Sequence, residues 1–138
     1  DLLRRAKYAE FTSLSRLKVR VTSREMMDYC LTYPGVYEDY PFDEEWAVMR
    51  HSGSRKAFAF IYKRNGHPCV NLKCDPMQSD FLRSVYAEVQ PAYHMNKVHW
   101  NTVLLDGTLP EEELSDMVEQ SFRLTQAGKS TRKNKKSG

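Results

Sequence analysis

The residues that could do chemistry are densest between Pro91 and Trp100. The polar and aromatic side chains of this run are Tyr93, His94, Asn96, Lys97, His99 and Trp100. With Lys73 they could bind a small ligand or an anion, through positive charge, hydrogen bonds and stacking rings. The alternative is structural: His94 and Asn96 would be buried in a turn or bulge and bonded to backbone, with Trp100 in the core. Both interpretations stay open, because polar groups this dense are costly to bury unless they are paired.

Metal binding and nucleophilic catalysis have weaker support. His94 and His99 are five residues apart, so on a strand they point to opposite faces, and neither paired cysteines nor HExxH spacing accompanies them. Cys74, at the expected start of a helix, is the one candidate nucleophile. Its alternation with Val70 and Leu72 favours a core position. The sequence thus predicts no metal, no cofactor and no catalytic residue, and it favours binding over catalysis.

Basic residues gather in a predicted hairpin region. Between Trp46 and Cys74 there is no acidic residue and there are six basic ones, namely Arg50, Arg55, Lys56, Lys63, Arg64 and Lys73. Four of them flank two turns, where a wing would reach phosphates. We predict nucleic-acid contacts from Arg50, Arg55, Lys56, Lys63 and Arg64.

Aromatic residues lie between those turns. Phe58, Phe60 and Tyr62 are expected on one face of a strand, which suits a sheet that faces nucleic acid. The alternative places the rings in the core and makes the basic residues ordinary solvated hairpin tips.

Charge is unevenly distributed along the 138 residues, whose net charge is +3. Residues 1–24 hold seven basic and two acidic groups, and residues 129–138 hold five basic groups and no acid, whereas residues 25–128 hold nine basic and sixteen acidic groups. Residues 25–128 are therefore acidic overall, which excludes a nucleic-acid-binding protein that is basic throughout.

No apolar run approaches the ~18 residues of a membrane helix. Cys69 and Cys74 are expected on opposite faces of one strand, so three free thiols and the cytoplasm are predicted.

The elements that must position these residues follow from periodicity and capping signals. Helices are expected over residues 24–32, 76–89 and 111–126. Ser23 is the expected N-cap of the first helix, and Asp75 with Pro76 begins the second. The apolar stripe of the second helix would be Phe81, Leu82, Val85 and Tyr86. The expected strands are 46–51, 57–63, 69–74, 92–95 and 98–105, with a loop over 36–45. Asn65-Gly66 predicts a type I′ hairpin turn.

Short connections between these elements predict an antiparallel sheet with helices on one face. The fold class is therefore α+β, two layers in the order α-β3-α-β2-α. Residues 1–22 would form an N-terminal extension, 23–127 one domain and 128–138 a disordered basic tail.

Three blocks of this sequence resemble the MmcQ/YjbR family. They are Pro34–Val36 with Glu38–Phe42, then Leu72–Pro76, then Pro91–Trp100 followed by Thr102-Val103 and Leu105–Gly107. The similarity spans roughly residues 23–126. It implies the α-β3-α-β2-α fold and a double-wing DNA-binding arrangement, with no established enzyme activity. DNA is thus the expected partner. The alternatives are a small-ligand or anion-binding protein centred on residues 93–99, or a protein-interaction domain that uses the sheet face.

Overall fold

The computed structural model describes residues 20–126, so the predicted basic tail and all but the last three residues of the predicted extension lie outside the described part. The helices are α2 (Ser23–Leu31), α3 (Pro76–Val85) and α4 (Glu111–Gln126). The strands are β1 (Val36–Asp39), β2 (Ala47–His51), β3 (Ala57–Arg64), β4 (His67–Lys73), β5 (Val89–Pro91) and β6 (Trp100–Leu104). The strands form one antiparallel sheet in the order β1-β2-β3-β4-β6-β5. The predicted α+β class is confirmed, with one strand more than expected.

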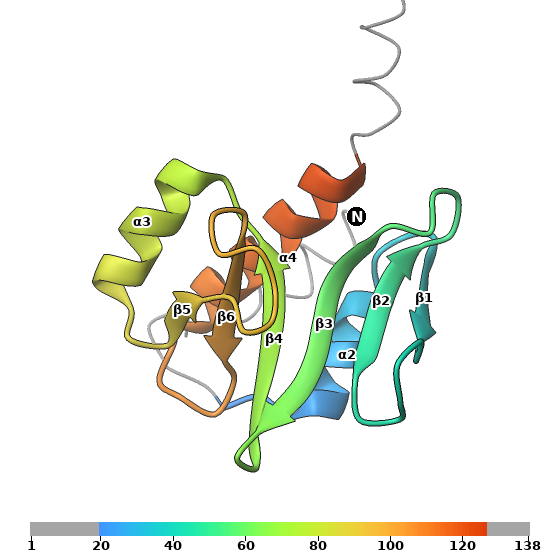
Figure 1. Cartoon of the computed structure of the whole chain (residues 1–138), viewed down its shortest axis with the longest axis horizontal. Coiled ribbons are helices and arrows are strands. Elements are labelled where there is room, and N and C mark those ends of the chain that lie inside the picture. The colour runs from blue at the N-terminus through green and yellow to red at the C-terminus, as the bar shows by residue number, and fades with distance from the viewer. Residues whose placement is uncertain (1–19, 127–138) are drawn as a thin grey trace, which may run out of the picture.

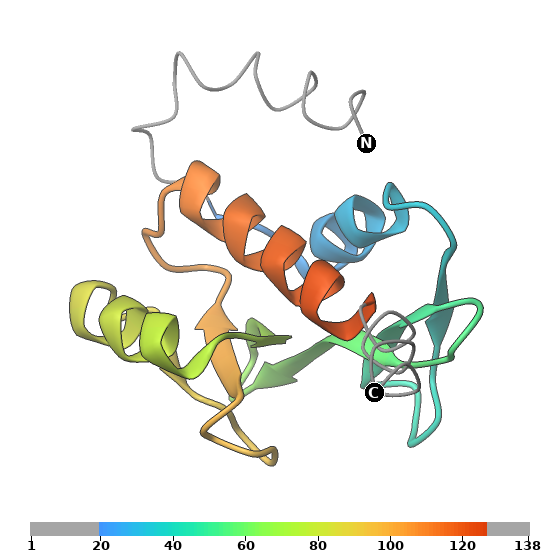
Figure 2. The ribbon, with the colours of Figure 1, turned by 90° about the horizontal axis from the view of Figure 1, so that it is seen from above.

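The sheet has two different faces. Helices α2 and α4 cover one of them, and the segment between β5 and β6 lies on the other (Figures 1 and 2). On the helix side, Phe58 of β3 meets Phe122 of α4 edge-on, with ring centroids 5.2 Å apart. Ile61 and Val70 belong to the same buried core. Burial of these apolar side chains against the two helices supplies the main stabilisation of the fold.

Local signals fix the beginnings of the helices and one hairpin. Asp75 caps α3 by accepting a hydrogen bond from the Gln78 amide at 3.2 Å, as predicted. Asn65 and Gly66 both have positive φ, 52° and 82°, which confirms the turn between β3 and β4.

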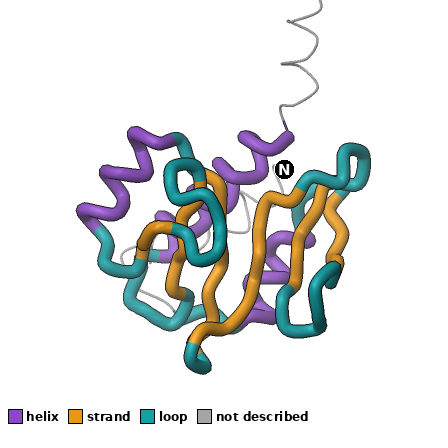
Figure 3. Tube along the Cα trace, in the orientation of Figure 1, coloured by secondary structure: helices purple, strands orange, loops and turns teal. Residues whose placement is uncertain are grey.

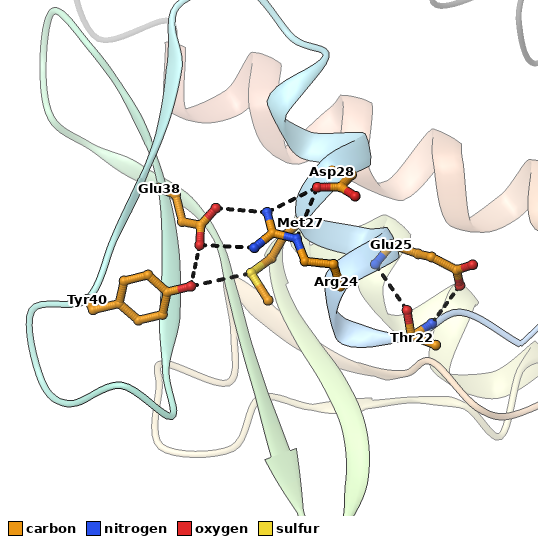
Figure 4. Close-up of polar contacts among 7 residues, drawn as sticks. All are labelled: Thr22, Arg24, Glu25, Met27, Asp28, Glu38 and Tyr40. Carbon is orange, nitrogen blue, oxygen red and sulfur yellow. Dashed lines mark hydrogen bonds and ion pairs between the residues drawn. The ribbon is translucent and has the colours of Figure 1, made fainter.

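The cap of α2 differs from the prediction, because Thr22 rather than Ser23 occupies the N-cap position. The Glu25 amide donates to the Thr22 hydroxyl at 3.1 Å, and the Thr22 amide donates to the Glu25 carboxylate at 2.9 Å (Figure 4). Two amides that helix geometry leaves without partners are satisfied by this reciprocal pair.

The loop predicted over residues 36–45 is partly wrong, because Val36–Asp39 forms β1 at the sheet edge. Its two acids have cationic partners. An Arg24 guanidinium nitrogen lies 2.9 Å from Glu38, and Arg50 Nε lies 2.8 Å from Asp39. Arg24 also reaches Asp28, and Tyr40 donates to Glu38 (Figure 4). Hydrogen bonds from Arg24 and Tyr40 lower the pKa of Glu38. Contacts from distant residues thus stabilise a strand that sequence pattern did not reveal.

Helix α3 is shorter than predicted, because the chain becomes extended at Tyr86 and forms β5 at Val89–Pro91. Its expected apolar stripe is also wrong in part. Leu82 is buried, whereas Phe81 is 62% exposed and Val85 is 51% exposed. The helix instead turns Ser79 inward, where its hydroxyl donates to Asn101 Oδ1 of β6 at 2.9 Å.

A β-bulge in β3 changes which aromatic residues share a face. Met49 pairs with Ala59 and Arg50 pairs with Ala57, so Phe58 has no partner on β2. The extra residue shifts the alternation of side chains by one. Phe58 therefore packs on the helix side, while Phe60 and Tyr62 lie on the opposite face. The expectation that the three rings share one face is wrong.

All three cysteines are free, as predicted, and all three are buried. Within residues 20–126, no helix combines the length and apolar character that crossing a membrane requires.

Candidate functional site

The sheet face opposite α2 and α4 carries a layer of aromatic side chains. Tyr62 lies at its centre, and the Trp46 ring stacks on it in parallel, with centroids 4.0 Å apart. The Tyr93 ring lies beside Tyr62 at 5.9 Å. Phe60 meets Trp100 edge-on at 5.6 Å. These five residues are termed the aromatic face.

A buried hydrogen-bond network lies beneath the rings. Asn71 Oδ1 accepts from the Tyr62 hydroxyl at 2.7 Å and from the Thr102 hydroxyl at 2.6 Å. The Asn71 amide group donates to the Tyr93 carbonyl at 3.0 Å, and the Tyr93 amide donates to the Thr102 hydroxyl at 2.8 Å. Asn71 and Thr102 are fully buried. Burial raises the pKa of Tyr62 to about 12, so its hydroxyl is neutral at pH 7. The network joins β3, β4 and β6 to the segment that carries Tyr93.

That segment, residues 92–99, is a loop and not the predicted strand (Figure 3). Asn96 Oδ1 accepts from the amides of Val98 and His99 at 2.8 and 3.1 Å. Lys97 Nζ donates to the Ala92 carbonyl at 2.8 Å. Asn96 and Lys97 therefore bind the loop's own backbone. Asn96 has the backbone partners that the structural interpretation predicted, but it is exposed and not buried.

Residues from other elements anchor the same loop. Arg83 of α3 donates to the carbonyls of Lys97 and Trp100. The Cys74 amide donates to the His99 carbonyl at 2.8 Å. Because these donors come from elements far away in sequence, alternation within the loop could not reveal its conformation.

His94 is the member of the loop that projects outward. It adopts a left-handed conformation with φ of 63° and is exposed, so it is not the buried residue that the structural interpretation required. Its ring centroid lies 3.9 Å from that of Tyr93 and 6.4 Å from that of Trp46. The 67% exposed Phe42 stands nearly perpendicular to Trp46, with ring centroids 6.4 Å apart. His94 and Phe42 are thus both aromatic neighbours of Trp46.

Positive charge adjoins the aromatic face at the β3–β4 turn. The Arg64 guanidinium carbon lies 4.1 Å from the Tyr93 ring centroid, within the range of a cation–π contact. A cavity of about 520 Å³ opens beside Arg64, and Arg20, Asn65 and Gln90 also line it. It is termed the tip cavity. Since Gln90 pairs with Thr102, the register places this cavity on the same side of the sheet as the aromatic face.

A histidine–aspartate pair forms another wall of the tip cavity. His67 Nδ1 lies 2.7 Å from Asp106 Oδ2. The hydrogen bond from His67 lowers the pKa of Asp106. The cavity therefore offers one anionic group among its cationic and amide groups.

The predicted wing residues occupy opposite ends of the sheet. Arg55 and Lys56 lie at the β2–β3 turn, and Lys63 and Arg64 lie at the β3–β4 turn (Figure 1). The eight residues of β3 separate the two turns by about 24 Å. Arg50 belongs to neither tip, because it pairs with Asp39 and donates to the Arg55 carbonyl. The two tips are therefore separate surfaces.

The structure brings only part of the alternative ligand set together. Tyr93, His94 and Trp100 lie on or beside the aromatic face, and pairing with Trp100 places Lys73 on this side of the sheet. Asn96, Lys97 and His99 form the supporting loop. Sequence reasoning missed Trp46, Phe42, Asn71 and Thr102, because the strand register and the loop conformation that bring such residues together have no local signal.

Nucleophilic and metal chemistry gain no support from the geometry. Cys74 is buried, and desolvation raises the pKa of its thiol. Between Arg20 and Gln126, no three histidine, cysteine or acidic side chains lie close enough to hold a metal ion.

Comparison with known proteins supports the resemblance seen in the sequence. The YjbR family model matches residues 31–124. The protein named "Uncharacterized protein YjbR" of Escherichia coli K12 is 32% identical over 103 residues, which cover 75% of this chain and 86% of that protein. The "Uncharacterized protein YyaQ" of Bacillus subtilis 168 is 37% identical, and the match covers 66% of this chain and 86% of that protein.

Solved structures agree with these relatives. A crystal structure of a Pseudomonas syringae protein superimposes with a TM-score of 0.68 at 33% identity and covers 76% of this chain and 99% of that one. A Deinococcus radiodurans protein with a DUF419 domain gives a TM-score of 0.68 at 30% identity, with 79% of each chain covered. The family match over most of the chain, the identity to curated relatives and the shared fold lead to one conclusion: the chain belongs to the YjbR family.

Proposed function

We propose that this protein binds nucleic acid, with DNA as its partner, and that the two hairpin tips contact backbone phosphates. The observation that carries the proposal is the segregation of charge. The segment from Trp46 to Cys74 has six basic residues and no acidic one, and Arg55, Lys56 and Lys63 are exposed at its two turns. Exposed arginine and lysine at protruding turns suit phosphate contact.

The surroundings of the tips support the same function. Arg64 and the tip cavity add positive charge and amide groups at one end, and the aromatic face lies between the two tips. The acids Asp43, Glu44 and Glu45 lie on the β1–β2 connection, outside the basic segment of the sequence. In the antiparallel meander this connection lies at the same end of the sheet as the Lys63–Arg64 tip, so of the two tips it is the Arg55–Lys56 tip that is set apart from these acids.

Salt dependence of DNA binding tests the proposal. Each phosphate contact contributes about 0.9 to the slope of log affinity against log salt on duplex DNA. Arg55→Gln combined with Lys56→Gln, or Lys63→Gln combined with Arg64→Gln, should each lower the slope by about 1.8. Arg123→Gln is the control for loss of a positive charge, because Arg123 lies on α4 and pairs with Glu119. A slope that all four tip substitutions together leave unchanged would show that the tips are not the phosphate contacts.

The tip cavity favours a second candidate, a small anionic ligand. Arg20, Arg64 and His67 line a space of about 520 Å³, which is within the usual size of ligand pockets. A thermal-shift screen of anionic metabolites and inorganic phosphate tests it, because a ligand that binds the folded state raises the melting temperature. A screen without any stabilising compound would remove this candidate.

A further inference from the structure

We propose that the nucleic acid is bound as a single strand, whose unpaired bases stack on the exposed surfaces of Trp46 and His94. This inference rests on the proposed function and adds the form of the nucleic acid and the residues that contact its bases.

Trp46 is the first stacking surface. Its ring lies parallel to Tyr62, which is only 2% exposed, while Trp46 itself is partly exposed. The exposed part of the indole therefore faces away from Tyr62. The ring centroids of Phe42 and His94 each lie 6.4 Å from that of Trp46. A flat ring with aromatic neighbours can accept a nucleobase in a stacked position.

His94 provides the second surface, and Tyr93 supports it because the two ring centroids are 3.9 Å apart. The Tyr93 backbone bonds to Asn71 and Thr102, and the Arg64 guanidinium lies against its ring. The His94 backbone is in the left-handed region, and its ring lies against Tyr93. Because Tyr93 is held in place before any ligand arrives, binding would require little additional ordering of this support.

Charge on the same side of the sheet suits a strand that runs across the aromatic face. Arg64 lies two residues beyond Tyr62 on β3, about 7 Å along the strand. Arg20 lines the tip cavity, and Lys73 lies on the same side of the sheet next to Trp100. Phosphates could therefore meet cations near both ends of the rings.

A duplex cannot use this surface in the same way. Its bases are stacked on one another and hide their ring faces, whereas a single strand exposes them to aromatic side chains. The arrangement of stacking rings with nearby cations matches the requirements of single-strand binding without base-specific hydrogen bonds.

Fluorescence of Trp46 provides the direct test. Trp100→Phe leaves Trp46 as the one tryptophan, because the chain has two. A single-stranded oligonucleotide of about 12 nucleotides, within the range of known single-strand sites, is compared with the same sequence in a duplex. We expect quenching of Trp46 and tighter binding for the single strand.

Two substitutions in the otherwise native chain measure the stacking contribution. Trp46→Ala should weaken single-strand binding about 5- to 150-fold, the range measured for the loss of one stacked base. His94→Asn removes the imidazole but keeps a residue that tolerates positive φ, and it should also weaken binding. Phe81→Ala is the matched control, because Phe81 is equally aromatic and 62% exposed but lies on α3. It should leave the affinity unchanged.

The outcomes separate this inference from the proposed function. Binding to duplex that is at least as tight as to single strand, with no loss in the Trp46 and His94 variants, overturns the single-strand inference and leaves DNA binding intact. Absence of binding to either form at low salt overturns both. If Trp46→Ala does not fold, the His94→Asn affinity and the quenching of the native Trp46 decide between these results.

Discussion

Replacing Asn71 by alanine tests whether the buried network holds the aromatic face in place. The substitution removes the shared acceptor of the Tyr62 and Thr102 hydroxyls and the donor to the Tyr93 carbonyl. The Tyr62 and Thr102 hydroxyls lie 3.2 Å apart and can still bond to each other. The loss of their hydrogen bonds to Asn71 is therefore partly offset. The Tyr93 carbonyl loses this donor, at a cost of about 1–3 kcal/mol.

Loss of the Asn71 side chain also leaves a void in a fully buried position, which adds about 1 kcal/mol. The free energy of unfolding should therefore fall by about 3 kcal/mol in total. Tyr62→Phe is the comparison, because it removes one hydroxyl while Asn71 still accepts from Thr102. Its cost should be about 1 kcal/mol, the typical net contribution of one hydrogen bond.

Urea denaturation followed by circular dichroism measures both variants. With an m-value of about 1.5 kcal/mol/M, the midpoint should fall by about 2 M for Asn71→Ala and by about 0.7 M for Tyr62→Phe. The double variant should cost less than the sum of the two, because both substitutions remove the same hydrogen bond. Equal costs for the two single variants, or strict additivity in the double variant, would refute the network as described.

Three further predictions concern caps, turns and pH. Thr22→Ala should lower the free energy of unfolding by about 1 kcal/mol, because it removes the cap of α2. Ser23→Ala should not destabilise the protein, since the buried Ser23 hydroxyl has no hydrogen-bond partner among the described residues. Similar losses of stability for the two variants in thermal melts would contradict the assignment of the cap. Gly66→Ala should cost about 1–2 kcal/mol because Gly66 has φ of 82°, and Gly53→Ala, equally free of steric contacts but outside the left-handed region, should be close to neutral in the same urea titration. Desolvation and the nearby Lys56 lower the pKa of the buried His51. Between the folded and unfolded pKa values the unfolded chain binds more protons than the native one, so stability should fall as pH decreases below about 6.5. His51→Asn should remove this part of the pH dependence, and a pH profile of the urea midpoint that the substitution leaves unchanged would contradict the prediction.

Much of the fold could be predicted from local chemistry. Asp75 before Pro76 identified the start of α3, and Asn65-Gly66 identified the hairpin, because each pair needs a specific backbone conformation. Strand β1 was missed because four residues with two acids do not resemble a strand. Their charges are compatible with the sheet edge only once Arg24 and Arg50 reach them.

The candidate site was harder to predict, for reasons that can be located in single residues. Alternation placed Phe58 with Phe60 and Tyr62, and one unpaired residue at the bulge separates it from them. The same reasoning treated residues 92–95 as a strand, whereas Asn71, Thr102 and Arg83 hold residues 92–99 as a loop. The opposite placement of the two tips was predictable, since consecutive turns of an antiparallel meander lie at opposite ends of its strands.

The bulge at Phe58 also bears on how this chain can change in evolution. Without it, the three rings of β3 would share one surface, and any change for ligand contact would disturb packing against α4. With it, Phe58 belongs to the helix-side core while Phe60 and Tyr62 belong to the aromatic face. Substitutions on either surface can then accumulate with little effect on the other. Deletion of Ala57 should remove the bulge and turn Phe58 to the face of Phe60 and Tyr62, so that Phe58 loses its packing against Phe122 and the fold is destabilised.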